Sequence, residues 1–263
     1  MAIQTLFLSH GGGPMPLLGD PGHVEMVACL RQIAEKIPRP DAIVVVSAHW
    51  EARLPTITAH AHPSLIYDYH GFPAESYRVK YPCPGAPALA GELQSLLRHR
   101  GVDAALDADR GLDHGVFVPL KIMYPEADIP CIQLSLCSDL DPVHHLAMGA
   151  ALSPLRRQKV LLIGSGFSFH NMKAFFASDT VESAEANRAF ERWLHETCLS
   201  PELSEAARAQ RLTQWADAPG ARFCHPREEH LLPLHVCYGA AQRPAAEVFS
   251  LNILGKAASM VVW

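Results

Sequence analysis

Short apolar runs alternate along the chain with longer segments whose apolar residues recur at helical spacing. This alternation is typical of βαβ units, in which helices cover a sheet. The apolar runs predict strands over residues 5–9, 42–48, 55–59, 102–106, 130–136, 160–163 and 247–263, the last folding back on itself near Gly255. The periodic segments predict helices over residues 22–37, 87–100, 116–123, 141–152, 181–198, 204–215 and 228–241. We therefore expect an α/β fold with a central, mostly parallel or mixed sheet flanked by helices.

The pattern contains no break that would divide the chain into parts. No segment is rich enough in Gly, Ser or Pro to form a long linker, and no internal repeat is present. Residues 60–87 are rich in proline and aromatic side chains but have little periodicity, which predicts a long functional loop. We expect a single domain over residues 1–263.

Composition narrows the class of protein. With 49% hydrophobic and 19% charged residues, the chain has an ordinary globular composition, which excludes disordered and fibrous classes. The net charge of -5, without a long basic run, argues against nucleic acid as a partner. No apolar stretch is long enough to span a bilayer and the first ten residues do not resemble a secretory signal, so we expect no membrane association and a cytoplasmic location. The seven cysteines form no CxxC pair, which predicts reduced, mostly buried thiols.

Histidine is unusually frequent, with 15 residues in 263. Three of them, His10, His49 and His170, come shortly after predicted strands. In a largely parallel sheet the carboxyl ends of the strands face one crevice, where α/β proteins bind their ligands. A single histidine at a strand end is more often structural, but three that converge favour a metal site.

The segments around these histidines allow other interpretations, which the sequence argues against. His10 opens LSHGGGP, whose glycines permit a sharp turn and close approach of the backbone to a ligand. The triple glycine lacks the Lys-Ser/Thr of a phosphate-binding P-loop. His170 ends GSGFSFH, in which the G-x-S-x-G pattern of a serine hydrolase cannot be found.

Two further segments complete the candidate site. His114 lies in LDHGVFVPL, with Asp113 beside it as a possible orienting carboxylate. His225 and His230 lie in HPREEHLLPL, where Pro226 is expected to start a helix. Five residues separate the two histidines, which places them about 140° apart on a helix, so one of them is expected to be structural or to support a ligand.

The remaining histidines are expected to play lesser roles. Six lie in helical patterns and are predicted to be surface or capping groups, namely His23, His99, His144, His145, His195 and His235. Three others, His60, His62 and His70, lie on the long loop, where they could line the mouth of a pocket.

Five segments in order, SHGGGP, VSAHW, DHGVFVPL, GSGFSFHN and HPREEHLLPL, resemble those of the DODA-type extradiol aromatic ring-opening dioxygenases. This class III, LigB-like family includes 4,5-DOPA dioxygenase. The resemblance implies one catalytic domain with its site at the strand carboxyl ends and a non-haem metal held by His10, His49 and His230. It also implies that His170 acts as acid or base and, in a resting or zinc-bound form, as a fourth ligand. His114 would contact the substrate or the dioxygen.

The third metal ligand differs within the wider family. Relatives of the protocatechuate type use a carboxylate there, so Glu229 is an alternative to His230, which we expect to be the ligand.

Three protein ligands leave open positions for the two adjacent oxygens of a catechol. Fe(II) can pass electron density from the catecholate to O₂, which Zn(II) cannot, so iron is the expected catalytic metal although zinc could occupy the same imidazoles. The neutral imidazole of His170 suits the proton transfers of ring opening to a semialdehyde.

Two other functions stay open at this point. A zinc-dependent hydrolase would also use an open histidine-rich site, with Glu229 as a nearby base. A Memo-like protein of the same wider fold would bind without catalysis, although the five histidine motifs argue against an inactive site. The sequence does not identify the aromatic substrate, because Tyr67, Tyr69, Phe72, Tyr77 and Tyr81 on the loop could either stack on a ring or simply pack.

Overall fold

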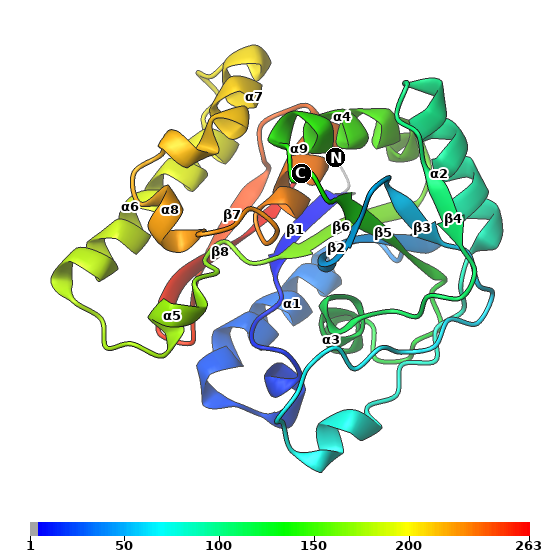
Figure 1. Cartoon of the computed structure of the whole chain (residues 1–263), viewed down its shortest axis with the longest axis horizontal. Helices are drawn as coiled ribbons and strands as arrows, with labels where there is room; N and C mark the ends of the chain where they lie inside the picture. The colour runs from blue at the N-terminus through cyan, green and yellow to red at the C-terminus, as the bar shows by residue number, and fades with distance from the viewer. Residues whose placement is uncertain (1–4) are drawn as a thin grey trace.

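The computed structural model describes residues 5–263, which form a mixed sheet of eight strands with helices on both faces (Figure 1). The strand order is β4-β3-β5-β2-β6-β1-β8-β7. The strands are β1 (Thr5–Ser9), β2 (Ala42–Ala52), β3 (Thr56–Thr58), β4 (Ala105–Asp107), β5 (Cys131–Cys137), β6 (Val160–Gly166), β7 (Glu247–Ile253) and β8 (Lys256–Val262). The central strands β5, β2, β6 and β1 are parallel, whereas β8 and β7 are antiparallel. The predicted α/β class and mostly parallel sheet are therefore confirmed.

Helices cover the two faces of this sheet (Figure 1). On one face lie α1 (Val24–Lys36) and α3 (His114–Met123), and on the other lie α2 (Pro87–His99), α4 (Pro142–Leu152) and α9 (Leu232–Ala241). The antiparallel end of the sheet carries α6 (Val181–Leu199). Next to α6 lie α7 (Glu205–Thr213) and the short α8 (Ala221–Cys224), while the short α5 (Met172–Phe175) follows β6.

The central strands are apolar throughout because both of their faces are buried. In β2, Ile43 and Val45 pack into the core beneath α1 and α3, whereas Val44 and Val46 pack into the core beneath α2, α4 and α9. The parallel strands bring their carboxyl ends to one edge, where the functional loops begin.

Helices α4 and α9 pack with their backbones in close contact. A Cβ atom at Gly149 would lie 2.1 Å from the carbonyl oxygen of Val236, a distance that real Cβ atoms do not adopt. Gly239 meets α4 in the same way, 2.3 Å from the carbonyl oxygen of Leu146. This contact fixes α9 over the sheet and thereby positions the segment that precedes α9.

Several boundaries differ from the sequence prediction, among them those of β2, α9 and β4. Strand β2 continues to Ala52 with a register shift between Val46 and Glu51, so His49 lies within the irregular part of the strand and not after it. Helix α9 begins at Leu232 and not at 228, because Pro233 is tolerated in the first helical turn but would break a hydrogen bond in a helix interior. Strand β4 is only three residues long.

Other expectations concern the cysteines and the bilayer. All seven cysteines are buried and unpaired, as predicted. Within the part of the chain that the structure describes, no helix combines the length and apolar character needed to cross a membrane.

Candidate active site

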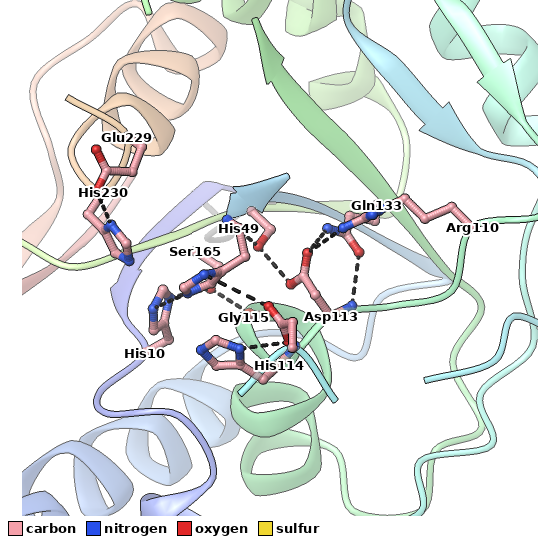
Figure 2. A network of polar contacts seen from close by, with 12 residues as sticks. His10, His49, Arg110, Asp113, His114, Gly115, Gln133, Ser165, Glu229 and His230 are labelled. Atoms are coloured by element: carbon pink, nitrogen blue, oxygen red, sulfur yellow. Dashed lines mark hydrogen bonds and ion pairs between the residues drawn. The ribbon is translucent and has the colours of Figure 1, made fainter. Parts of the chain in front are cut away.

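Five histidine rings meet at the carboxyl ends of β1, β2 and β6. Figure 2 shows four of them, His10, His49, His114 and His230. His10 follows β1, His49 comes from the irregular end of β2, and His114 is the first residue of α3. His170 lies four residues after β6, and His230 lies in the turn before α9. The ring centroids of His49 and His114 are 4.0 Å apart, and those of His170 and His230 are stacked at 3.3 Å. The structure thus brings together all five histidines that the sequence singled out.

Three of these rings have the geometry of a metal site. One nitrogen each from His10, His49 and His230 lies within 4.8 Å of the others. The Nε2 atoms of His10 and His49 are 3.0 Å apart. Two nitrogens that bind one metal at right angles, each at about 2.1 Å, are separated by about 3.0 Å. Nε2 of His230 is buried and has no hydrogen-bond partner among residues 5–263.

The outward nitrogens of two rings are held by hydrogen bonds. Nδ1 of His10 lies 3.1 Å from Oγ of Ser165, whose hydroxyl donates to the carbonyl of Gly115 and therefore accepts from His10 (Figure 2). Nδ1 of His230 donates to Glu229 at 3.0 Å. These bonds place the ring protons on Nδ1 and leave the lone pairs of Nε2 facing inward, which is the usual arrangement of metal-binding histidines.

Burial keeps these imidazoles uncharged. Desolvation lowers the pKa of His10 and of His49 well below the ordinary value, and the neighbouring imidazoles lower it further. Desolvation likewise lowers the pKa of His230 to about 3. Neutral imidazoles are the form that binds metals.

Carboxylates surround the cluster and support it. Asp68 accepts hydrogen bonds from Nδ1 of His114 at 2.8 Å and from its backbone nitrogen at 3.0 Å. Glu229 contacts Nδ1 of His170 at 3.4 Å in addition to His230. Although burial raises the pKa of Glu229, its hydrogen bonds with His170 and His230 lower it below the usual range. Arg227 pairs with the other oxygen of Glu229 at 3.3 Å.

Asp68 also forms part of a His49–Asp68–His114 group, and Glu229 forms part of a His170–Glu229–His230 group, each with the spacing of a metal site. In both groups the carboxylate already accepts a hydrogen bond from a ring nitrogen. Both groups are therefore explained as supports of the imidazole cluster.

Sequence reasoning chose the wrong orienting carboxylate for His114. Asp113 faces away from the ring of His114 and accepts hydrogen bonds from Ser47, at 2.8 Å, and from Gln133. Its side chain lies beside the N-terminus of α3, while the ring of His114 turns toward the loop that carries Asp68. The available signal for Asp68 was an acidic residue between two tyrosines in the predicted functional loop.

The histidines outside the cluster have structural or surface positions, some of which differ from the prediction. His225 is buried, with Nε2 2.7 Å from the carbonyl oxygen of Ser168, so it is the structural member of its pair. His23, His145 and His235 were predicted to be surface or capping groups, but the structure buries them fully. Their ring nitrogens form hydrogen bonds with backbone groups, which satisfies these polar atoms in the interior. The loop residues His60, His62 and His70 are exposed and do not line the cavity at the cluster.

The glycine segment after His10 shapes the floor of the site. Nε2 of His23 accepts from the backbone nitrogen of Gly12 at 2.9 Å, and Nδ1 of His23 donates to Asp20 at 2.6 Å. Gly11 has φ +78°, and a Cβ atom there would lie 2.6 Å from the His23 ring. Glycine at position 11 is thus required both by the backbone conformation and by the buried ring.

A cavity of about 390 Å³ opens onto the histidine cluster. Of the five aromatic loop residues, Tyr69 and Phe72 line it, whereas Tyr67, Tyr77 and Tyr81 are not among its lining residues. Phe167 and Phe175 add further aromatic surface. The arrangement offers several imidazoles and an apolar enclosure for a small molecule.

The chain is similar to proteins of one family. The family model for the catalytic LigB subunit of aromatic ring-opening dioxygenase matches residues 6–261. Dioxygenase tasH of Hapsidospora irregularis is 43% identical over 90% of this chain and 78% of its own length. The 4,5-DOPA dioxygenase extradiol of Beta vulgaris is 41% identical over 90% of this chain and 87% of its own.

A bacterial protein and a solved structure are also similar to this chain over most of its length. The 4,5-DOPA dioxygenase extradiol of Escherichia coli K12 is 35% identical over 90% of this chain and 85% of its own length. The crystal structure of an uncharacterized protein from Escherichia coli K12 superposes with a TM-score of 0.76 at 31% identity, covering 99% of both chains.

Proposed function

The chain belongs to the family of the catalytic LigB subunit of aromatic ring-opening dioxygenases and is an extradiol ring-cleaving enzyme; from this premise we propose that it adds both atoms of O₂ to a small catechol. The product would be a ring-opened semialdehyde. We assign this activity to one catalytic domain that comprises residues 1–263. The observation that supports the proposal most strongly is the convergence of five imidazoles on one apolar cavity.

LigB extradiol dioxygenases depend on a metal, and we propose His10, His49 and His230 as its ligands in this chain. The spacing of their nitrogens and the unpartnered, buried Nε2 of His230 support this choice over Glu229. Three ligands leave positions for the two adjacent oxygens of a catechol. When bound, Fe(II) supplies a path for electrons from the catechol to O₂, which Zn(II), without an accessible second oxidation state, does not.

His170 is proposed as the group that moves protons. Its ring lies against that of His230, and it lines the cavity. Because Glu229 engages Nδ1 of His170, Nε2 is the nitrogen available to take a phenolic proton from the catechol and to return one during ring opening.

His114 is proposed as a contact for the substrate or the dioxygen. Its Nδ1 is held by Asp68, so its Nε2 is the nitrogen free to face the cavity that the ring lines. An imidazole fixed in this way presents one defined polar atom in a mostly apolar enclosure.

A zinc-dependent hydrolase finds less support. The hydrolase considered from the sequence would use a carboxylate, Glu229, as the base beside the attacking water. No Asp or Glu is among the residues that line the cavity in the described range 5–263. Glu229, the base considered from the sequence, is already bonded to His230 and Arg227.

The test is metal-dependent oxygen consumption. Protein freed of metal by chelation is reloaded anaerobically with Fe(II) or with Zn(II) and then mixed with O₂ and a panel of catechols. We expect O₂ uptake and a yellow semialdehyde with Fe(II), and binding without turnover with Zn(II). Turnover of a hydrolysable substrate with Zn(II) under nitrogen, without O₂ uptake in the iron sample, would favour the hydrolase.

A further inference from the structure

The cavity at the histidine cluster has a largely apolar lining apart from its histidines. Besides the histidines and the glycines after His10, the lining comprises aromatic and aliphatic residues, among them Met15, Tyr69, Phe72, Phe167, Phe175 and Leu254. Within the described range, no Asp, Glu, Lys or Arg belongs to this lining. A charged group that entered the cavity would therefore lose its water without gaining an ionic partner.

The polar atoms that do line the cavity are mostly engaged by the protein. The hydroxyl of Tyr69 donates to the carbonyl of Ser76 at 2.7 Å. Both ring nitrogens of His23 are used, by Gly12 and by Asp20. Apart from the imidazoles assigned to the metal, to proton transfer and to contact with the substrate or dioxygen, the lining offers few free side-chain polar atoms to bind an ionised substituent.

The carboxylates and the arginine near the cavity are engaged by other groups of the protein. Asp68 accepts from His114, and Glu229 is held by His230 and Arg227. Arg227 also makes two contacts with Glu51, at 2.5 and 2.7 Å. A second depression, which shares His170 and Met172 with the cavity, contains Lys173, which is exposed and does not line the cavity itself.

The rim of the cavity is apolar and open to solvent. Phe176 is 85% exposed and Met172 is 53% exposed, and both line the cavity beside α5. Leu254, in the turn between β7 and β8, is 37% exposed on the same cavity. Large apolar side chains gathered at the mouth of a cavity mark a surface that binds an apolar ligand.

These observations bear on the substituent of the substrate. We propose that the catechol carries an uncharged, apolar substituent that extends from the histidine cluster to the rim formed by Met172, Phe176 and Leu254. This proposal rests on the proposed function for the catechol itself. It sets the chain apart from relatives whose names specify DOPA, because DOPA carries a zwitterionic head group.

The test compares ligands that share the catechol ring. Zn(II)-loaded protein, kept anaerobic, is titrated calorimetrically with 4-methylcatechol, 4-butylcatechol, 3-(3,4-dihydroxyphenyl)propanoate and DOPA. We expect the affinity to rise up to about fourfold per added methylene from methyl to butyl. We expect the carboxylate and DOPA to bind at least about 100-fold more weakly than 4-butylcatechol. Equal or tighter binding of DOPA or of the carboxylate would overturn the proposal.

Variants locate the effect at the rim. Phe176→Asp should weaken binding of 4-butylcatechol about tenfold or more, because it places a charge beside the apolar chain. Val181→Asp is the matched control, since Val181 is 80% exposed and does not line the cavity, and it should leave that affinity unchanged. Equal effects of the two variants would overturn the proposed path of the substituent.

Kinetics separate this inference from the proposed function. With Fe(II), the order of kcat/KM should follow the order of affinity. A failure of every catechol to support O₂ uptake would reject the proposed function, whereas uptake with DOPA as the preferred substrate would reject only the inference about the substituent.

Discussion

Hydrogen bonds on the outward nitrogens organise the histidine cluster at the level of single residues. Ser165 holds His10, Glu229 holds His230, and Asp68 holds His114. Each partner fixes the position of the ring proton, so the inward Nε2 atom keeps its lone pair. Removal of a ring and removal of its partner should therefore have different consequences.

The first prediction separates ligands from the proton-transfer group. His10→Ala should lose most of the bound metal, because one of three proposed ligands disappears. His170→Ala should keep most of the iron and still bind catechol, while turnover falls by about 10² to 10⁴, the usual contribution of a positioned acid or base. Iron content per chain and the rate of ring opening measure the two effects.

His99→Ala is the control for this pair, because His99 is exposed at the end of α2 and does not line the cavity. It should match the unmodified protein in both measurements. If His170→Ala lost metal as severely as His10→Ala, His170 would be a ligand and not a base.

The second prediction concerns Asp68 as a positioning residue. Asp68→Ala removes the acceptor for Nδ1 of His114, so kcat should fall about 10- to 100-fold with the iron content retained. Asp68→Asn keeps an acceptor oxygen and should restore much of kcat. Asp139→Ala is the control, because it removes another Asp–His pair, with His144, at the exposed surface.

A purely structural role for Asp68 would give another pattern. Asn would then rescue neither kcat nor the melting temperature, and the loss of activity would follow the loss of folded protein.

At the level of secondary structure, the contact between α4 and α9 fixes the segment that contains His230. Glycines at both sides of this contact let the two backbones approach. A side chain added there has to displace backbone atoms, whereas a side chain added on an open helix face does not.

The third prediction compares two glycines in helices. Gly149→Ala should lower the free energy of unfolding by about 1–3 kcal/mol, because its Cβ would meet the backbone of α9. Gly91→Ala, in α2, has no atom within 4 Å of its added Cβ and should raise the free energy of unfolding by about 0.5–1 kcal/mol. Urea unfolding followed by circular dichroism measures both, and equal shifts in the same direction would contradict the proposed contact.

At the level of the whole molecule, a buried acid on α6 makes stability depend on pH. Glu191 is buried, and the hydroxyl of Ser259 on β8 donates to its carboxylate. Burial raises the pKa of Glu191 to about 7, although hydrogen bonds with Ser259 and Ser168 oppose the change. Between pH of about 4.5 and 7, the folded protein therefore binds a proton that the unfolded chain has released, and this contribution to stability declines as the pH rises.

Buried histidines act in the opposite direction. Burial lowers the pKa of His225 to about 3 and that of His235 to about 4, so the unfolded chain binds more protons in acid. Their contribution to stability increases as the pH rises toward about 6.5. The effect of Glu191 is thus visible only as a difference between two proteins with the same histidines.

The fourth prediction is that difference. Glu191→Gln is uncharged at every pH, so its free energy of unfolding should rise relative to the unmodified protein from pH 5 to pH 8. The expected rise is on the order of 3 kcal/mol. Urea unfolding at several pH values measures it, and a constant difference across this range would contradict the raised pKa of Glu191.

The sequence by itself determined the class of fold and most of its elements. Apolar runs and helical periodicity are signals that neighbouring residues carry, so they can be recognised in the sequence. The prediction therefore located several elements within a few residues, among them β5, the first part of β2, α2 and α4. It also pointed to the histidines that lie together in the structure, because the carboxyl ends of parallel strands meet at one edge of a sheet.

Only the tertiary structure decided how these residues are supported and enclosed. Asp68 reaches His114 across 46 positions, and the roles of His225 and His230 depended on where Pro233 allows α9 to begin. The apolar rim joins Met172 and Phe176 to Leu254, which lies in a turn almost eighty residues later. Such contacts join segments that are distant in the sequence, and their energies depend on the final tertiary geometry. They leave no periodic pattern in the sequence from which they could be predicted.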